Sequence, residues 1–295
     1  MRVGRRDVVE VGLIGAGIGD SLSPVLHERE AGLLGFDYRY SLIDLDRLGR
    51  APEEVGDLVR EAQRDGMRGV NVTHPCKQLV VDALDELSPA AAAAGAVNTI
   101  VIDGARLVGH NTDGSGFQEA FARGLPDAEL ERVALLGAGG AGTALGHALL
   151  DLGAGCLTVV DVDADRAWGL AEALTRRYGA GSATATTPRS LDTVLAWADG
   201  LVHATPTGMS GHPGSAVPRE LLEPRHWVAD VVYMPIETQL LRDARRRGCR
   251  TLNGAGMVAL QAAGSLGLFT GAEPDRARML RHVEELIGEG RQQAA

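Results

Sequence analysis

Four short polar motifs in the first 115 residues carry side chains that could bind a small molecule and exchange a proton with it. Each motif lies near the end of an apolar, strand-like run. Ligands of open parallel sheets bind beyond the carboxyl ends of the strands, so the motifs predict one site built from several strand ends. They are Ser21-Leu22-Ser23-Pro24, Asn71-Val72-Thr73-His74-Pro75-Cys76-Lys77, Gly95-Ala96-Val97-Asn98-Thr99 and Asn111-Thr112-Asp113.

A second kind of site is predicted by a glycine-rich loop that completes the G-x-G-x-x-G pattern between a strand-like run and an Ala/Leu-rich helix. Gly137 permits a tight turn, Gly139 lets the backbone approach a pyrophosphate, and Gly142 lets helix and strand pack closely. The N–H groups of the helix N-terminus then face the anion. The full loop is Gly137-Ala138-Gly139-Gly140-Ala141-Gly142.

Asp161 indicates which dinucleotide this loop would hold, because it follows the next strand-like run, 19 residues after Gly142. Its carboxylate can accept hydrogen bonds from the ribose 2′-OH of NAD. The 2′-phosphate of NADP would bring like charges together, at about 4 kcal/mol for each unit pair ~4 Å apart near a surface. Asp163 adds to this repulsion. Arg166 could offset part of it, hold the Asp161 side chain or stack on adenine.

An earlier loop imitates the dinucleotide pattern, but Asp20 occupies its last glycine position. We interpret it as an ordinary loop of the first domain because the fingerprint is incomplete. The loop is Gly15-Ala16-Gly17-Ile18-Gly19.

The elements that must position these motifs alternate between strand and helix along the chain, which favours parallel sheets with helices on both faces. A helix over Gly116–Leu125 joins two sets of strands, and apolar residues at helical spacing, from Leu79 to Leu87, indicate another helix. The last helix, Arg276–Ile287, has no strand after it. The predicted strands are Val8–Ile14, Tyr38–Ile43, Gly69–Val72, Ala96–Ile102, Arg132–Leu136, Leu157–Val160, Gly200–His203 and Trp227–Val232.

We therefore predict an α/β protein of two domains. Residues 1–115 with 255–295 form a substrate-binding and catalytic domain around an open, mostly parallel sheet. Residues 116–254 form a Rossmann-like NAD-binding domain, and the C-terminal helix returns to the first domain.

Composition excludes several other classes of function. A net charge of −10 makes a nucleic-acid or anionic-membrane partner a poor fit, and the arginine run 242–250 is interpreted as the solvated face of a helix. No segment approaches the ~20 apolar residues of a membrane span. The three cysteines are widely spaced and form no C-x-x-C motif, which fits a protein of the reducing cytoplasm. The N-terminus is not expected to be a signal peptide, because Glu10 interrupts its apolar stretch. Histidines without paired ligand spacing predict no metal.

Taken in order, the motifs resemble the shikimate dehydrogenase family, including its NAD-dependent quinate/shikimate branch, over nearly the whole chain. The family usually has a basic or polar residue where Asp20 stands, and Asn is common at the position of His203, which we interpret as packing at a strand end. The second half contributes Ala204-Thr205-Pro206-Thr207-Gly208-Met209, Asp230-Val231-Val232-Tyr233-Met234-Pro235, Gly254-Ala255-Gly256-Met257 and Gln261.

The resemblance implies reversible, NAD-dependent oxidation of a ring hydroxyl of shikimate or quinate to 3-dehydroshikimate or 3-dehydroquinate, with Lys77 and Asp113 as the acid/base pair. Such a reaction would belong to aromatic amino acid biosynthesis or quinate metabolism. Alcohol oxidation needs hydride loss and proton loss, and a positioned Lys beside a carboxylate can accept that proton. Asp113 could also, or instead, cap the helix that follows it.

The same resemblance assigns binding roles. Ser21 and Ser23 would hold the substrate carboxylate, although Ser23 before Pro24 also fits a plain helix N-cap. Tyr233 would lie near this carboxylate or pack in the core. The ring hydroxyls would bond to Asn71, Thr73, Asn98 and Gln261, the dinucleotide would contact Gly137, Gly139, Gly140, Gly142, Asp161 and Arg166, and the nicotinamide would be lined by Thr205, Val232, Gly254 and Met257.

Two alternatives remain open in the sequence. One is an NADP-linked shikimate or aminoshikimate-type dehydrogenase. The other, from a different class, is a non-catalytic ligand-binding regulator on the same scaffold. The chain is expected to act as a monomer or a homodimer.

Overall fold

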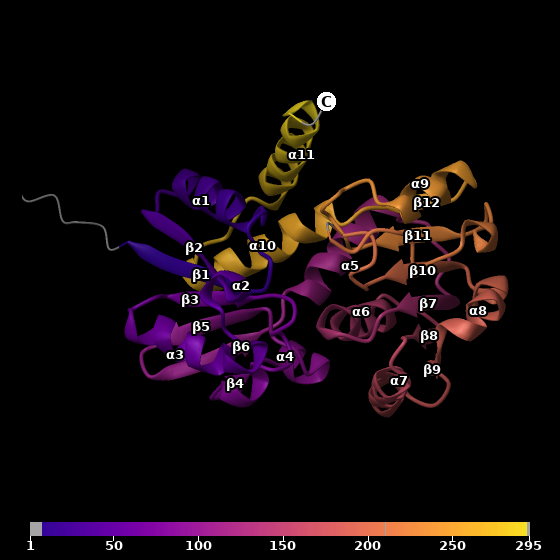
Figure 1. Cartoon of the computed structure of the whole chain (residues 1–295), viewed down its shortest axis with the longest axis horizontal. Coiled ribbons are helices and arrows are strands. Elements are labelled where there is room, and N and C mark those ends of the chain that lie inside the picture. Colours follow the sequence, from indigo (N-terminus) through magenta and orange to yellow (C-terminus); the bar gives the residue numbers. More distant parts are fainter. Residues whose placement is uncertain (1–7, 210, 294–295) are drawn as a thin grey trace, which may run out of the picture. The chain divides into compact units, whose positions relative to one another are not determined.

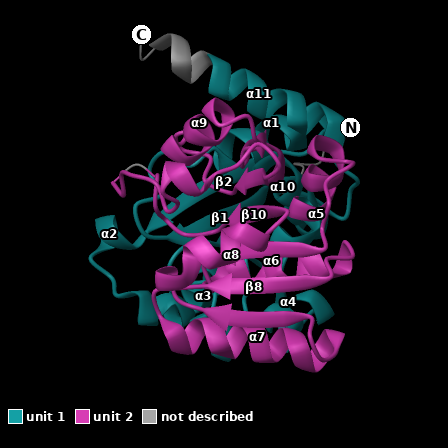
Figure 2. Cartoon of the chain, turned by 90° about the vertical axis from the view of Figure 1, so that its right-hand side faces the viewer, with its two compact units in different colours: residues 1–116, 258–295 teal, residues 117–257 magenta. Residues whose placement is uncertain are grey.

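The computed structural model describes residues 8–209 and 211–293. The chain forms two compact units, of which unit 1 comprises residues 1–116 with 258–295 and unit 2 comprises residues 117–257 (Figure 2). Each unit holds one six-stranded sheet (Figure 1). The fold is therefore α/β with one sheet in each unit.

Unit 1 has a mixed sheet whose strand order is β2-β1-β3-β5-β6-β4. The first three strands run parallel, while β5 runs antiparallel to both β3 and β6. Short 3-10 turns lie at Pro52–Glu54 and Val81–Ala83. The elements are β1 (Val9–Gly15), α1 (Ser23–Leu33), β2 (Tyr38–Asp44), α2 (Leu45–Leu48), α3 (Val55–Arg64), β3 (Gly69–Val72), β4 (Glu86–Leu87), α4 (Pro89–Ala94), β5 (Thr99–Asp103), β6 (Arg106–His110), the start of α5 (Asp113–Gly124), most of α10 (Ala255–Thr270) and α11 (Arg276–Gln293).

Unit 2 has a wholly parallel sheet of order β12-β11-β10-β7-β8-β9. Read from the β9 edge, this is the 3-2-1-4-5-6 order of the Rossmann fold, and the order reverses between β7 and β10. Further 3-10 turns lie at Pro188–Ser190 and Arg219–Leu221. The elements are β7 (Arg132–Leu136), α6 (Gly140–Asp151), β8 (Cys156–Val160), α7 (Ala164–Tyr178), β9 (Ala183–Thr186), α8 (Leu191–Trp197), β10 (Gly200–His203), β11 (Trp227–Asp230), α9 (Gln239–Arg246) and β12 (Arg250–Leu252).

The core of unit 1 lies on both faces of its sheet. Along β1, Val11 and Leu13 join one apolar cluster with Phe269 of α10, and Ile14 joins another with Val59 of α3. Burial on both faces explains why the central strand is a nearly continuous apolar run. The packing of Phe269 also ties α10 to this sheet.

The last helix is also attached to unit 1, as the sequence predicted. Glu30 of α1 is fully buried, and its carboxylate accepts hydrogen bonds from the guanidinium of Arg278 of α11 at 2.5 and 2.8 Å. Its Oε1 also accepts the backbone N–H of Asp275, just before α11. A buried carboxylate needs such partners, so this contact fixes the start of α11 on α1.

The predicted strand bounds agree best with the structure for strands in the middle of a sheet. The bounds of β7 and β10 are those predicted, whereas β5 begins at Thr99 rather than Ala96. β11 ends at Asp230 instead of Val232, because the Asp230 carboxylate accepts the Val232 N–H and turns the chain. The four short strands β4, β6, β9 and β12 were not predicted.

The helix predicted from Leu79 to Leu87 is wrong. This stretch forms turns and a 3-10 turn, and then pairs as β4 with β6. Asp85 fixes the pairing, since its N–H donates to the Leu107 carbonyl and its carboxylate accepts the Leu107 N–H. Tertiary pairing therefore overrides the helical spacing of the apolar residues.

His27 makes the stability of unit 1 depend on pH. It is 1% exposed among Tyr38, Tyr40 and Phe269, and burial lowers its pKa from 6.5 to about 3. As the pH falls below 6.5, the unfolded chain binds the proton first. The stabilisation is therefore complete above 6.5 and declines toward pH 3, by up to ~1.4 kcal/mol per pH unit.

We expect His27→Phe to flatten this decline, measured as free energy of unfolding in urea between pH 4 and 7. The exposed His212 offers a control, and His212→Phe should retain the wild-type slope. Equal slopes for His27→Phe and wild type would contradict this account.

Candidate active site

Lys77 and Asp113 meet in unit 1. The Lys77 Nζ donates to Asp113 Oδ2 at 2.6 Å, and the side chains are 17% and 5% exposed. Lys77 lies in the turns after β3, not in a helix, and Asp113 is the first residue of α5. A cation beside a mostly buried carboxylate, with part of its surface open, is an arrangement suited to proton exchange.

The Asp113 carboxylate is held from its other side by Asn98. The Asn98 Nδ2 donates to Asp113 Oδ1 at 3.0 Å and to Thr112 Oγ1 at 2.8 Å, with Gln261 Oε1 at 3.4 Å. The Asn98 Oδ1 accepts the Thr112 N–H and the Thr99 hydroxyl. Both carboxylate oxygens of Asp113 are thus bonded by side chains, and the carboxylate orientation is fixed.

A buried network of polar side chains contacts Asn98 and the residue after it. Asn71 Nδ2 lies 3.0–3.1 Å from three acceptors, which are the Asn98 carbonyl, Thr99 Oγ1 and Ser265 Oγ. Tyr40 donates its hydroxyl to Asn71 Oδ1 at 2.8 Å. Tyr40, Thr99 and Ser265 were not predicted as site residues. Thr99 lies in the motif Gly95–Thr99, and Ser265 is a polar residue one turn after Gln261 in an otherwise apolar helix, whereas Tyr40 left no signal.

Ser21 and Ser23 lie at the start of α1, just beyond the carboxyl end of β1. Ser23 is not the N-cap, because the helix begins at Ser23 itself and no side chain caps it. Its N–H donates to Ser21 Oγ at 3.3 Å. A Cβ on Gly15 would lie 2.3 Å from Thr73 Cγ2, so Thr73 lies against the end of β1, the strand that leads to Ser21.

The first glycine loop is occupied by the protein itself, which agrees with its interpretation as an ordinary loop. Asp44, at the end of β2, accepts the N–H groups of Gly17 and Ile18 at 3.2 Å and that of Asp46 at 3.1 Å. A carboxylate bound to these donors would repel a phosphate.

The second glycine loop, in unit 2, enters a helix whose first N–H groups are not capped by a side chain. Gly137 has φ +105°, and a Cβ on Gly142 would lie 1.9 Å from the Gly137 carbonyl oxygen. The next helix, α6, begins at Gly140 with no side-chain cap. Its first-turn N–H groups can therefore bond an anion. Nothing lies within 4 Å of a Cβ on Gly139, as expected for space facing a ligand.

Asp161 closes this loop onto the end of β8. Its carboxylate accepts the Ala138 N–H at 2.7 Å and the Asp163 N–H at 2.9 Å. Asp163 caps α7 and pairs with Arg166 at 3.3 Å. The ion pair of Arg166 is therefore with Asp163 and not with Asp161. Each Asp161 oxygen retains a lone pair for a ribose hydroxyl.

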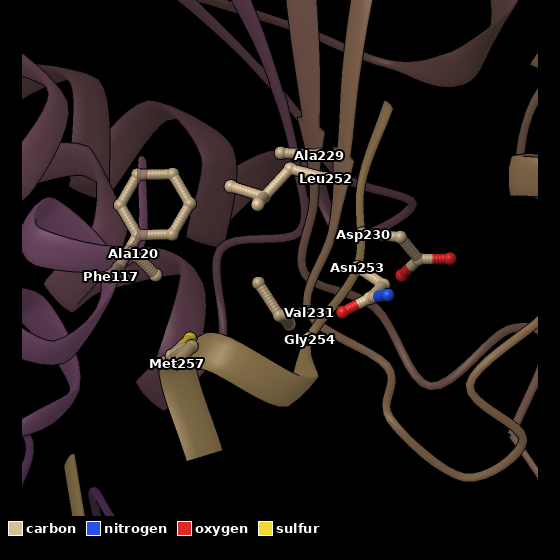
Figure 3. A pocket seen from close by; sticks show the side chains of 9 residues that line it. All are labelled: Phe117, Ala120, Ala229, Asp230, Val231, Leu252, Asn253, Gly254 and Met257. Carbon is tan, nitrogen blue, oxygen red and sulfur yellow. The ribbon is translucent and has the colours of Figure 1, made fainter. Parts of the chain in front are cut away.

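The remaining predicted residues of unit 2 gather at the carboxyl ends of β10, β11 and β12. Thr205 follows β10, Val232 and Tyr233 follow β11, Gly254 lies just before α10 and Met257 lies in its first turn. A small pocket with an apolar surface lies beside these residues, and the carboxylate of Asp230, which is one of its lining residues, points away from Phe117 and Met257 (Figure 3). Its lining is Phe117, Ala120, Ala229, Asp230, Val231, Leu252, Asn253, Gly254 and Met257.

Over residues 8–209 and 211–293, no three His, Cys, Asp or Glu side chains gather as a metal site. In the same part of the chain, none of the helices has the length and apolar character to cross a membrane.

Comparison with known proteins decides the family. Residues 13–100 match the model of the shikimate dehydrogenase substrate binding domain. A shikimate dehydrogenase (NADP(+)) of Streptomyces avermitilis is 60% identical over 283 residues, covering 96% of this chain and 97% of the relative. The chain belongs to the shikimate dehydrogenase family.

Two further relatives of this family carry a different cofactor in their names. A quinate/shikimate dehydrogenase (NAD(+)) of Corynebacterium efficiens is 47% identical over 277 residues, covering 92% of this chain and 96% of the relative. The structure of quinate dehydrogenase from Corynebacterium glutamicum in complex with NAD matches with TM-score 0.84 and 44% identity, covering 93% and 98% of the two chains. This chain is thus a shikimate/quinate-type oxidoreductase that uses a nicotinamide dinucleotide.

Substitutions of two glycines in the loop should distinguish an effect on stability from an effect on cofactor binding. Gly142→Ala places a methyl group against the Gly137 carbonyl and should lower the melting temperature as well as cofactor affinity. Gly139→Ala meets open space, so the melting temperature should be unchanged, while the methyl group obstructs the pyrophosphate and weakens binding.

Thermal unfolding and NADH titration on both variants test this. If the Gly139→Ala variant binds NADH as tightly as wild type, the pyrophosphate does not lie against Gly139.

Proposed function

We propose that this family member catalyses reversible, NAD-dependent oxidation of a ring hydroxyl of shikimate or quinate, with Lys77 and Asp113 as its acid/base pair. The observation that carries the proposal is the 2.6 Å contact between Lys77 and a carboxylate that Asn98 holds in place. A regulator that only bound the ligand would have no need of this pair.

Lys77 is the only lysine in the chain, whose other 28 basic side chains besides histidine are arginines. Arginine remains protonated at any physiological pH and cannot take up a proton. Where only charge is needed, this sequence uses arginine. The one lysine stands where the reaction needs a base, which supports proton transfer rather than simple ion pairing as its role.

In the proposed reaction, the hydroxyl proton passes to Lys77 as a neutral amine, and the resulting ammonium pairs with Asp113. The bound dinucleotide would supply the acceptor for the hydride of the carbinol carbon. The balance is alcohol and NAD⁺ to ketone, NADH and a proton. In reverse, Lys77 returns the proton to the carbonyl oxygen. Asn98 keeps the Asp113 carboxylate aimed at Lys77 throughout.

The substrate is held by neutral donors and acceptors in this proposal. Ser21 and Ser23 bind its carboxylate, with Tyr233, and Thr73, Asn98 and Gln261 bond its ring hydroxyls. Asn71 acts mainly through Asn98, because three protein acceptors already lie within reach of its two amide hydrogens. A site built from such bonds discriminates against analogues that lack a hydroxyl.

NAD is supported by the loop after β8. Asp161 is followed by Val162, which is 88% exposed, and by Asp163, to which Arg166 is already bonded. A 2′-phosphate would meet two carboxylates there. NADP remains the second candidate, because the 60% identical relative is named for it. Gly137, Gly139, Gly140 and Gly142 would hold the pyrophosphate, and Thr205, Val232, Gly254 and Met257 the nicotinamide side.

Replacing the only lysine tests the acid/base role. We expect Lys77→Arg, which keeps the charge, and Lys77→Met, which removes it, to lower kcat alike by about 10²–10⁴-fold. Initial rates of NADH formation with shikimate and with quinate measure this. Arg39→Met, at an exposed position of the same unit, is the control for loss of a cation.

Retention of most activity in Lys77→Arg would show that only charge matters at this position and would reject the proton transfer. Failure of wild type to turn over either acid with either dinucleotide would instead favour a binding role.

Changing the charge of the loop between β8 and α7 tests the preference for NAD over NADP. Wild type should prefer NAD over NADP in kcat/KM. The double variant Asp161→Asn, Val162→Arg removes one repulsive carboxylate and adds a cation directly after the strand. The preference should therefore move toward NADP by at least 10-fold, which is about 1.4 kcal/mol and less than the value of one unit charge pair near a surface.

The two dinucleotides are compared at saturating shikimate or quinate. An Ala164→Arg variant adds the same charge within α7 and should shift the ratio of kcat/KM for NAD to that for NADP less. A wild type that prefers NADP would overturn the assignment of NAD.

A further inference from the structure

His203 packs fully buried at a strand end, as the sequence predicts, and it also makes two side-chain hydrogen bonds. It ends β10 opposite Asp230, which ends β11, and both side chains are at most 1% exposed. His203 Nδ1 lies 2.9 Å from Asp230 Oδ1, and His203 Nε2 lies 2.5 Å from Thr205 Oγ1. The three residues form a continuous hydrogen-bonded row.

The surrounding donors determine the direction of these bonds. Thr238 Oγ1 accepts the Leu241 N–H at the start of α9, so its own hydrogen goes to Asp230 Oδ2, at 2.6 Å. Val232 N–H also donates to Asp230. Asp230 is therefore an acceptor throughout, and His203 must donate to it from Nδ1.

This direction extends to Thr205. In the Nδ1–H tautomer of His203, Nε2 is an acceptor that can take the Thr205 hydroxyl hydrogen. One lone pair of Thr205 Oγ1 accepts the Thr207 N–H at 3.3 Å. In this tautomer, the other lone pair of Thr205 Oγ1 is left to accept a hydrogen bond.

Thr205 stands where the dinucleotide is expected. It follows β10 at the point where the strand order reverses, and a Cβ on Gly137 would lie 3.0 Å from Thr205 Cγ2. At the other end of the row, Asp230 lines the pocket with Gly254 and Met257. The row therefore connects the glycine loop with the pocket within unit 2.

We propose that Asp230 and His203 are positioning residues that fix Thr205 as a hydrogen-bond acceptor for the nicotinamide riboside half of the cofactor. The donor on the ligand is the carboxamide N–H or a ribose hydroxyl. This inference rests on the proposed use of a nicotinamide dinucleotide.

Two substitutions isolate the row. Thr205→Val keeps the side-chain shape and removes the hydroxyl. His203→Asn keeps an N–H near Asp230, where the imidazole Nδ1 lies, yet is too short to reach Thr205. Each should weaken NADH binding by about 2–10-fold, the value of one neutral hydrogen bond. Calorimetric or fluorescence titration of NADH measures the dissociation constants without turnover.

A double-mutant cycle distinguishes positioning from general support of the fold. If His203 acts through Thr205, adding His203→Asn to Thr205→Val should weaken NADH binding no further. Additive effects, or full affinity in Thr205→Val, would overturn the proposal. His226→Asn, at a buried histidine before the amino end of β11, should leave NADH affinity unchanged, and thermal unfolding verifies that each variant is folded.

An analogue identifies the ligand group. The 3-acetylpyridine analogue of NAD lacks the carboxamide N–H. If Thr205 accepts from that group, Thr205→Val should not weaken binding of the analogue, whereas a ribose donor would leave the 2–10-fold loss in place. Wild type that fails to bind NADH would reject the proposed function itself, while wild type that binds normally with an additive cycle rejects only the role of the row.

Discussion

The mostly buried carboxylate of Asp113 is the constraint around which unit 1 is arranged. A carboxylate removed from water is costly unless charges and donors surround it. Lys77 supplies the charge and Asn98 the donor, and Asn98 is itself held by Thr99 and Thr112. The turns after β3, the ends of β5 and β6 and the start of α5 are thereby fixed in one cluster. Removing any one partner would leave the others with unsatisfied polar groups.

The two units contain the same local design with opposite outcomes. In each, a central strand ends in a glycine loop, and a carboxylate at the end of the neighbouring strand accepts N–H groups from that loop. Asp44 takes two N–H groups of the first loop and Asp161 one of the second. The second loop then enters a helix whose first N–H groups lack a side-chain cap. The difference between a closed turn and an anion site thus lies in how many loop donors the protein uses itself.

Local features of this fold could be predicted from the sequence, and long-range ones could not. The strand, loop and helix around Gly137–Gly142 follow from neighbouring residues, because glycine geometry and helix starts are short-range. The segment from Leu79 to Leu87 was misjudged, since pairing with β6 decides it. The hydrogen bond of His203 with Asp230 was missed for the same reason, as only strand register brings the two residues together. The pairing of Lys77 with Asp113 came from family resemblance, because their spacing of 36 residues carries no geometric information.

The solitary lysine has a practical consequence for chemistry on this protein. Reagents directed at amines ordinarily decorate a protein surface at many places, but here the surface cations are guanidinium groups, which such reagents leave alone. Apart from the α-amino group, an amine-selective label can reach one side chain, and that side chain is 17% exposed beside Asp113. The mass added by such a label would count accessible sites directly, so occupancy by a ligand becomes readable as protection of a single atom.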